Sequence, residues 1–174
     1  IYPATRSEAK WSATVKLEIT ADTLSSYGDP AVGPDGRYLY FTSDMPGGQG
    51  KLDLWRINLK DRRGTLENLG DQINTPGNER FPYCRTDSIL YFSSDGHAGF
   101  GGLDIFRATL QPSGRWFIEN LGSPMNSSDD DFGITFGKGE SGYFSSNRKD
   151  GRGYDHIYSF EKPDLKIWIS GYVM

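Results

Sequence analysis

The stretch "YFSSDGHAGFGGLDIF", residues 91–106, carries the clearest information about this chain. It begins and ends as a strand-like apolar run, and four glycines followed by an aspartate stand between the two runs. Taken alone, such a stretch suits a phosphate-binding loop, a metal-binding loop or a repeated structural turn. Self-similarity elsewhere in the chain separates these interpretations, because a structural turn that builds a repeat architecture recurs at a fixed period.

The stretch belongs to a segment that occurs three times, at residues 29–59, 80–110 and 131–160. A Tyr-Phe pair recurs in each copy at spacings of 51 and 52 residues, at positions 40–41, 91–92 and 143–144. An aspartate recurs at steps of 51 residues, as Asp53, Asp104 and Asp155. The linkers repeat as well, as "LENLGDQINTPGNE" at 66–79 and "IENLGSPMNSSDD" at 118–130. This self-similarity indicates a repeat architecture.

Each copy predicts short β-strands, and four strands are expected per unit. In the second unit they are residues 80–86, 89–94, 103–110 and 115–122. A tight turn joins the first two strands, and Asp-Gly or Gly-rich pairs suit it because the turn needs positive φ. The glycine-rich stretch joins the second strand to the third. The segment "WSATVKLEI" at 11–19 is predicted to be a fourth strand left over from a preceding unit.

Four-stranded antiparallel units of about 40–50 residues that repeat along a chain are typical of a β-propeller. One unit cannot bury both of its faces, so neighbouring units stack radially and bury them together. We therefore predict an all-β chain of three four-stranded blades plus an orphan outer strand. Because a ring usually needs four or more blades, these residues are expected to be part of a larger ring. The remaining blades are expected from another chain, from a part removed by proteolysis, or from sequence beyond these residues.

The predicted boundaries follow the repeat. Residues 1–28 are assigned to an outer strand and linker of a preceding blade. Residues 29–79, 80–130 and 131–165 are assigned to three blades, with the completeness of the last one left open. Residues 166–174 are assigned to the start of a following β-domain.

Composition agrees with this fold class and excludes several functions. Aromatic residues make up 14% of the chain, which also holds 22 Gly and 9 Pro, as expected for short strands separated by turns. The net charge of −4, without a basic block, argues against nucleic acid as a partner. No apolar run approaches the roughly 20 residues needed to span a bilayer, so membrane insertion is not expected. The chain opens without a signal peptide, and both ends read as interior sequence, so we expect a piece of a longer protein.

The glycine-rich stretches lack the signatures of ligand-binding loops. A P-loop requires G-x-x-x-x-G-K-[ST], and "GGQGKL" has neither that spacing nor a hydroxyl residue after Lys51. An EF-type calcium loop requires D-x-[DN]-x-[DN]-G and a distal Glu, which "SSDGHAG" and "SSDDDFG" do not supply. No G-x-S-x-G motif is present, and the single Cys84 has only His97 and His156 as candidate bases. We expect no catalytic residue, no metal site and no cofactor, with Cys84 buried in a strand.

The repeated aspartates favour a structural role. A residue that recurs once per unit in fixed register holds every unit together more readily than it serves one site. We expect Asp53, Asp104 and Asp155 to accept backbone N–H bonds from the glycine-rich turn that precedes each of them. The glycines would allow the close backbone approach that these bonds need. We call this arrangement the turn clamp.

The loops that join the second and third strands differ between the copies, and differences of this kind favour binding. The candidate interaction residues there are Asp44, Gln49, His97, Phe100, Arg148 and Arg152. Arg56, Arg107 and Arg148 are expected on solvated faces.

The repeat resembles a known family on the residues "DPAVGPDG", "LYFSS", "GGLDIF" and "NLG…N". It is similar to the WD-like repeat of TolB-type propellers, and closer to the version in OmpA-family envelope proteins of Bacteroidetes-type bacteria. The resemblance covers roughly residues 11–160. The tail "LKIWISGYVM" at 165–174 resembles the first strand of a carboxypeptidase-regulatory-like β-domain, which often follows such a propeller.

The resemblance implies a PorE-like envelope protein of the type IX secretion and gliding lineage. It implies a periplasmic location associated with the outer membrane, protein partners in the cell envelope, and contact with peptidoglycan only through a neighbouring domain. The expected function is a non-catalytic propeller that serves as an interaction module. The alternative is a propeller that is accessory to an enzyme, as a gate or a glycan-binding unit.

Overall fold

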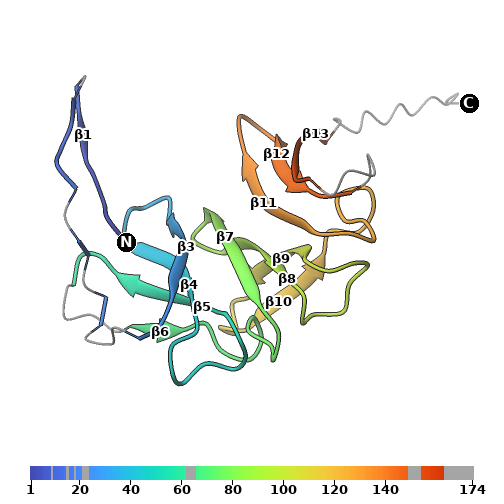
Figure 1. Cartoon of the computed structure of the whole chain (residues 1–174), viewed down its shortest axis with the longest axis horizontal. Helices are drawn as coiled ribbons and strands as arrows, with labels where there is room; N and C mark the ends of the chain where they lie inside the picture. The colour runs from blue at the N-terminus through green and yellow to red at the C-terminus, as the bar shows by residue number, and fades with distance from the viewer. Residues whose placement is uncertain are drawn as a thin grey trace, which may run out of the picture.

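The computed structural model describes residues 1–8, 10–14, 16–17, 19–20, 24–61, 66–148 and 154–162. These residues are all-β, with strands in antiparallel sheets and no helix, as the composition predicts. Three of the sheets follow one another along an arc in chain order, and the arc does not close (Figure 1). The sheets are compatible with the predicted blades.

Sheet 1 has the order β3-β4-β5-β6 and sheet 2 the order β7-β8-β9-β10, so each strand pairs with the next one in the chain. The strands of sheet 1 are β3 (Tyr27–Val32), β4 (Tyr38–Ser43), β5 (Asp53–Asn58) and β6 (Glu67–Asn68). Those of sheet 2 are β7 (Glu79–Thr86), β8 (Ile89–Ser94), β9 (Asp104–Leu110) and β10 (Trp116–Asn120). The four-strand pattern predicted from the sequence is confirmed for these two units.

Sheet 3 differs from the prediction. Its described strands are three, β11 (Asp131–Phe136), β12 (Ser141–Ser146) and β13 (His156–Glu161), in the order β11-β12-β13. Of the three four-stranded units predicted, two are observed as sheets of four strands. The third has three strands within the described residues. The segment 166–174, assigned to a following β-domain, lies outside the described residues.

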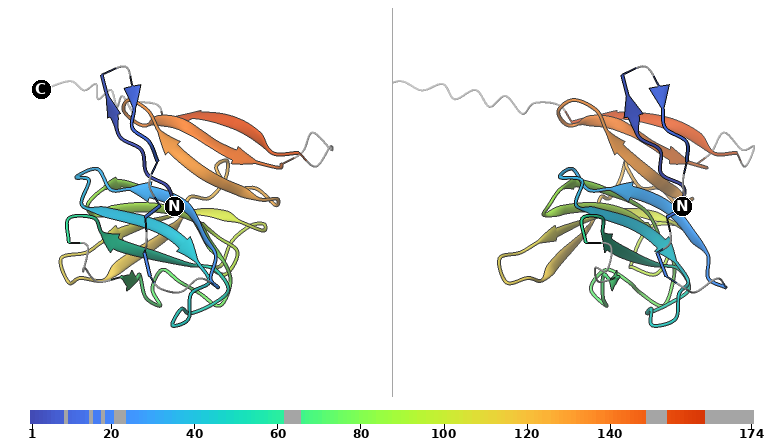
Figure 2. Two further views of the ribbon diagram at one scale, coloured as in Figure 1. Left: turned by 60° about the vertical axis from the view of Figure 1, so that its left-hand side comes forward. Right: turned by 90° about the vertical axis from the view of Figure 1, so that its left-hand side faces the viewer.

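The described residues between 12 and 19 do not form the orphan strand predicted over 11–19. A two-residue strand β1 (Arg6–Ser7) pairs instead with β2 (Lys10–Trp11), and the described residues from 12 to 20 contain no strand. In sheets 1 and 2 the fourth strand pairs with the third strand of the same sheet. No described strand precedes Arg6, so an orphan fourth strand would have no third strand to pair with among the described residues. The β1–β2 hairpin extends away from the three sheets in all views (Figure 2).

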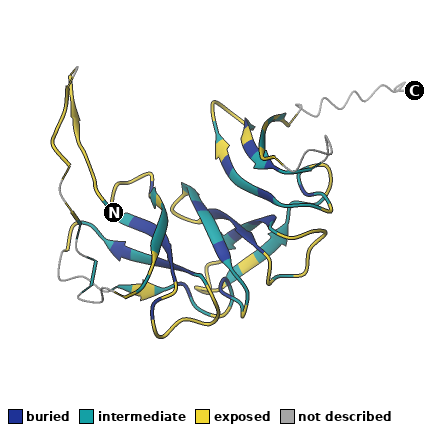
Figure 3. Ribbon diagram, viewed as in Figure 1, coloured by how far each residue is buried: buried dark blue, intermediate teal, exposed yellow. Residues whose placement is uncertain are grey.

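Two interfaces hold the three sheets together. The first, between sheets 1 and 2, buries eight side chains: Tyr40, Leu54, Leu69, Ile73, Leu90, Phe92, Phe106 and Ala108. The second, between sheets 2 and 3, buries four: Tyr91, Ile105, Ile134 and Phe144. Because β8 lies between two packed faces, Leu90 and Phe92 contact the first interface while Tyr91 contacts the second. Burial is therefore concentrated in the middle strands (Figure 3).

Arginines from sheet 2 add ion pairs across both interfaces. Arg80 pairs with Asp29 of sheet 1 at 3.0 Å, and Arg85 pairs with Glu140, in the turn that joins β11 to β12 of sheet 3, at 2.6 Å. The Arg85 guanidinium also lies 4.0 Å from the ring centroid of Phe136, within cation–π range. These partly exposed pairs fix how neighbouring sheets are oriented more than they stabilise the chain.

The first strands of sheets 1, 2 and 3 contain the same irregularity. Asp29, Phe81 and Gly133, spaced 52 residues apart, all have positive φ, at 47°, 53° and 65°. The pairing register shifts at each of these positions, as in a β-bulge. Pro30 and Pro82 follow the first two positions, where a missing N–H donor is tolerated because the strand lies at the sheet edge. The bulge bends β3, β7 and β11 alike.

Candidate functional site

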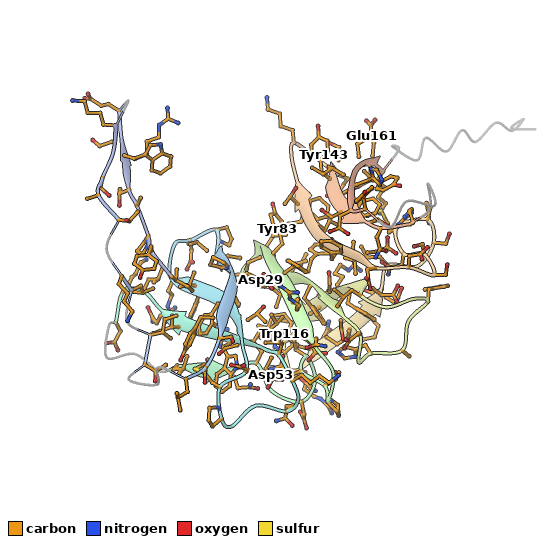
Figure 4. All side chains as sticks on the ribbon, in the orientation of Figure 1. Asp29, Asp53, Tyr83, Trp116, Tyr143 and Glu161 are labelled. Atoms are coloured by element: carbon orange, nitrogen blue, oxygen red, sulfur yellow. The ribbon has the colours of Figure 1, made fainter. Side chains whose placement is uncertain are left out.

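The turn preceding β5 and the turn preceding β9 are held by equivalent carboxylates, those of Asp53 and Asp104. Asp53 accepts the backbone N–H groups of Gln49 and Gly50, and its Oδ2 also accepts Asn68 Nδ2 at 2.9 Å. Asp104 accepts the N–H groups of Phe100 and Gly101 through its Oδ2. Asp53 and Asp104 are buried at the first position of their strands, and Figure 4 labels Asp53 there. These are the bonds that define the turn clamp.

Glycine is required in this turn because the carboxylate occupies the space of a Cβ atom. A Cβ added at Gly48 would collide with the Asp53 carboxylate, and one at Gly99 would collide with that of Asp104. Neither glycine has a positive φ, so close approach rather than backbone conformation excludes other residues. A Cβ added at the neighbouring Gly101 would likewise collide with the backbone of Asp129 in the following linker.

The third aspartate does not occupy the clamp position. The pairing register matches Ser43 with Asp53 and Ser94 with Asp104, but it matches Ser146 with His156. Asp155 therefore lies one residue before β13, and it is exposed. The step of 51 residues does not hold here, because Ser94 and Ser146 lie 52 residues apart and the position equivalent to Asp104 is therefore 156 rather than 155. The turn that precedes it lies largely outside the described residues.

The linkers contribute a second repeated contact that the sequence reasoning missed. Asn74 accepts the N–H of Leu54 at 2.8 Å and donates to the carbonyl of the same residue at 3.0 Å. Asn126 does the same to Ile105, at 2.8 and 2.9 Å. Both amides are buried, and each also donates to the Asn at the end of the preceding strand, Asn68 or Asn120. Asn74 and Asn126 lie 52 residues apart in the repeated linkers, so the linker repeat is the sequence pattern that could have predicted this contact.

A third repeated contact lies at the start of β7 and β11. Glu79 accepts the backbone N–H and the hydroxyl of Thr75, and the hydroxyl of Ser94 at 2.7 Å. Asp131 accepts the equivalent groups of Ser127. Both carboxyls are fully buried, and burial raises the pKa of Glu79 above its ordinary value although the hydroxyl and N–H donors oppose the shift.

Arg148 is an internal residue rather than part of a free interaction loop or a solvated face. Its guanidinium pairs with the buried Asp131 and donates to the carbonyls of Pro124 and Met125. It also lies 5.0 Å from the centroid of Phe144, within cation–π range. Arg148 turns inward because the buried carboxylate of Asp131 needs a cation beside it. The sequence did not reveal this pair because Asp131 lies on a different strand.

His97 is likewise internal. Its Nε2 donates to the carbonyl of Ile73 at 2.8 Å, and its ring packs against Phe92 and Phe106 at centroid distances of 5.7 and 5.1 Å. The carbonyl can only accept, so this bond requires a proton on Nε2. The ring therefore connects sheet 2 to the linker that leaves sheet 1, and the interaction role predicted for His97 does not fit this half-buried position.

Three other interaction candidates, Asp44, Gln49 and Phe100, are exposed. Asp44 accepts the N–H of Ser26 at 2.7 Å, while the side chain of Gln49 lies at the surface. Phe100 is the most apolar of the group and is 59% exposed. Arg152 lies outside the described residues. The structure thus leaves Gln49 and Phe100 at equivalent positions of two neighbouring loops, each donating its backbone N–H to the clamp below it.

Arg56 and Arg107 form ion pairs inside their own sheets. Arg56 pairs with Glu67 at 2.9 Å, and Arg107 pairs with Glu119, in each case across the third and fourth strands. These residues are partly solvated, as expected. They contribute to the pairing of the outer strand rather than to contacts between sheets.

A groove of about 410 Å³ lies where the three first strands meet. It is lined by residues 29–32, 81–84 and 133–135, which include the three bulges. Asp29 and Tyr83, labelled in Figure 4, come from neighbouring strands at this place. The walls are mainly apolar, and the Arg80–Asp29 pair supplies the charged groups beside them. Such a surface suits contact with a protein segment more than proton transfer.

The described residues show no cluster of metal-ligating side chains. No group of three or more His, Cys, Asp or Glu side chains in them is placed to hold a metal ion. Cys84 is half-buried, its Sγ lies 3.2 Å from the carbonyl oxygen of Thr86, and burial raises the pKa of its thiol. Burial also raises the pKa of Tyr40, which lies at the same interface, to about 12. A thiol with a raised pKa is a weak nucleophile at neutral pH.

Within the part of the chain that the structure describes, no helix is long and apolar enough to cross a membrane. No family model matches the sequence. No curated protein matches it either. The sheets, the clamps and the groove described above therefore supply the structural basis for an assignment of function.

Proposed function

We propose that this chain is part of a β-propeller that serves as a non-catalytic interaction module in a bacterial cell envelope. One observation carries the proposal: three sheets with the same internal strand order pack face to face, with their first strands gathered around a common groove. Radial packing of this kind is the way in which propeller blades bury their faces.

The repeated polar contacts support a structural use of the residues that recur. Asp53, Asp104, Asn74 and Asn126 all bind backbone groups of their own unit, so the repeated side chains are committed to internal bonds. What varies between the units is the surface of the loops, and loops on a rigid scaffold are the usual place for binding. The exposed Phe100 is the clearest apolar contact residue there.

The envelope location rests on the sequence resemblance alone. The repeat resembles that of OmpA-family envelope proteins of the type IX secretion lineage, so the proposed compartment is the periplasm, in association with the outer membrane. The proposed partners are proteins of the envelope, and peptidoglycan is reached only through a neighbouring domain. Fold alone does not establish this role, because propellers serve many functions.

The test uses the gene-encoded protein in its own bacterium. A photo-crosslinking amino acid is placed at Gln49, at Phe100 or, as the matched control, at Phe117, which is 55% exposed on β10. We expect the protein to fractionate with the envelope, and the two loop positions to capture the same protein partner. Recovery in the cytosol, or crosslinks at Phe117 but not at the loops, would contradict the proposal.

A further inference from the structure

One pair of equivalent positions on the first strands makes a contact across each of the two sheet interfaces, but the two contacts differ in chemistry. Between sheets 1 and 2, the Asp29 carboxylate pairs with the Arg80 guanidinium, 3.0 Å from Nε and 3.3 Å from Nη2. Between sheets 2 and 3, the rings of Phe81 and Phe132 stack with their centroids 5.0 Å apart. In both cases the bulge residue of one sheet meets the residue that precedes the bulge in the next sheet.

The two contacts join into one line that crosses all three sheets. The Arg80 guanidinium, held by Asp29, also lies 4.4 Å from the ring centroid of Phe81, within cation–π range. The side chain of Asp29 is only 14% exposed, and that of Arg80 is 37% exposed. A carboxylate that is shielded from water to this extent depends on its cation and hydrogen-bond donors.

A buried hydroxyl behind the line shows the difference between the two contacts. In sheet 1, the hydroxyl of Thr42 donates to the Asp29 carboxylate at 3.2 Å. Ser93 holds the equivalent position in sheet 2, where the bulge residue is Phe81 and offers no side-chain acceptor. The Ser93 hydroxyl is buried and has no hydrogen-bond partner among the described residues. Sheet 2 therefore leaves a hydroxyl unpaired, at a cost in stability, while it presents a ring to sheet 3.

We propose that these unlike contacts determine which sheet packs on which, and that they hinder the exchange of sheets between chains. The three sheets share one strand order and bury apolar faces, and the linkers fix their sequence only within one chain. Sheet 3 of one chain on sheet 1 of another would place Phe132 opposite Asp29 and leave that carboxylate without its cation. An unpaired charge against the wrong partner is a usual source of specificity.

This role matters for a repeat protein because misassembly and domain swapping are its characteristic failures. The inference concerns how the sheets assemble, and it does not depend on the envelope partner proposed above.

Two double variants make the contacts alike, one at each interface. Asp29→Phe with Arg80→Phe gives both interfaces an aromatic stack, and the positive φ of 47° at position 29 is close to the 53° that Phe81 already adopts. Phe81→Asp with Phe132→Arg gives both interfaces an ion pair and offers Ser93 an acceptor. Each protein is unfolded in urea and refolded by dilution at about 100 μM, within the range where exchange between chains competes with folding. Size-exclusion chromatography with light scattering then separates the products, and circular dichroism establishes their fold.

Two single variants serve as controls. Arg80→Lys keeps a cation beside Asp29, so the contacts stay unlike. Asp104→Ala weakens a turn inside sheet 2 and leaves both contacts intact. We expect the wild type and both controls to return to the species that each forms before unfolding. Both double variants should give about ten times more folded, soluble oligomer, because one unpaired charge worth about 1.4 kcal/mol changes an equilibrium tenfold.

Double variants that refold as cleanly as the wild type would overturn the inference. As much oligomer from Asp104→Ala or Arg80→Lys would also overturn it, because lost stability rather than a wrong partner would then be the cause. So would a wild-type chain that itself refolds mainly into oligomers. Loss of the fold in both double variants would show that the two contacts are not interchangeable, with the same consequence. Gln49 and Phe100 are unchanged throughout, so these outcomes are separate from those of the crosslinking experiment.

Discussion

Replacing Asp104 by alanine tests the turn clamp most directly. The Asp104 carboxylate is buried and accepts two backbone N–H groups, from Phe100 and Gly101, through one oxygen. Its other oxygen, Oδ1, is buried and accepts no bond from the described residues. Bonds to a charged acceptor contribute about 1.5–3 kcal/mol each, whereas an unsatisfied buried oxygen costs about 1–3 kcal/mol. The two effects oppose each other, so the net loss for Asp104→Ala should be about 2 kcal/mol.

The magnitude is checked by urea unfolding at neutral pH, extrapolated linearly to water. A loss of about 2 kcal/mol corresponds to a fall of roughly 4–8 °C in the melting temperature of a chain of this size. Asp53→Ala should cost more than Asp104→Ala, because Asp53 uses both oxygens and also accepts from Asn68. Asp155→Ala is the matched control, and it should change stability by less than about 0.5 kcal/mol because Asp155 is exposed.

Two results would refute this reasoning. If Asp155→Ala cost as much as Asp104→Ala, the sequence period rather than the strand register would identify the clamp. If Asp104→Ala left the melting temperature unchanged while a binding activity disappeared, the carboxylate would belong to a binding site and not to the turn.

Four further predictions follow from the same contacts. Gly99→Ala should lose stability to a similar degree as Asp104→Ala, and the double variant should lose less than the sum, because both changes break one contact; thermal melts of all three check this. Arg148→Ala should lower the free energy of unfolding by about 3 kcal/mol, because it leaves the Asp131 carboxylate buried without its cation, and Arg148→Lys should recover part of that loss in urea titrations. Burial raises the folded pKa of Glu79 above its unfolded value, so its contribution is complete below about pH 4 and is lost as pH rises through the folded pKa. The free energy of unfolding of Glu79→Gln should therefore fall less than that of the wild type between about pH 4 and pH 7, and equal slopes would contradict this. Cys84 should react with a thiol reagent at least about ten times more slowly in the folded chain than in urea, because burial raises its pKa and restricts access.

The repeat and its strands were accessible from the sequence because they depend on local patterns. Short aromatic and β-branched runs predict strands, and turn residues between them set the pairing of each strand with the next. The three-fold recurrence then removed the ligand-loop interpretation of residues 91–106. The clamp position of Asp53 and Asp104 followed from the same register.

The tertiary structure decided what depends on register and on distant partners. Ser94 and Ser146 lie 52 residues apart, so His156 rather than Asp155 stands opposite Ser146, and the 51-residue step between the aspartates does not follow the strand register. Arg148 and His97 turn inward because Asp131 and the Ile73 carbonyl, distant in sequence, accept hydrogen bonds from them. Which faces remain open is also a property of the packed array, because Tyr91 and Tyr143 are equivalent in sequence and differ only in whether a neighbouring sheet covers them.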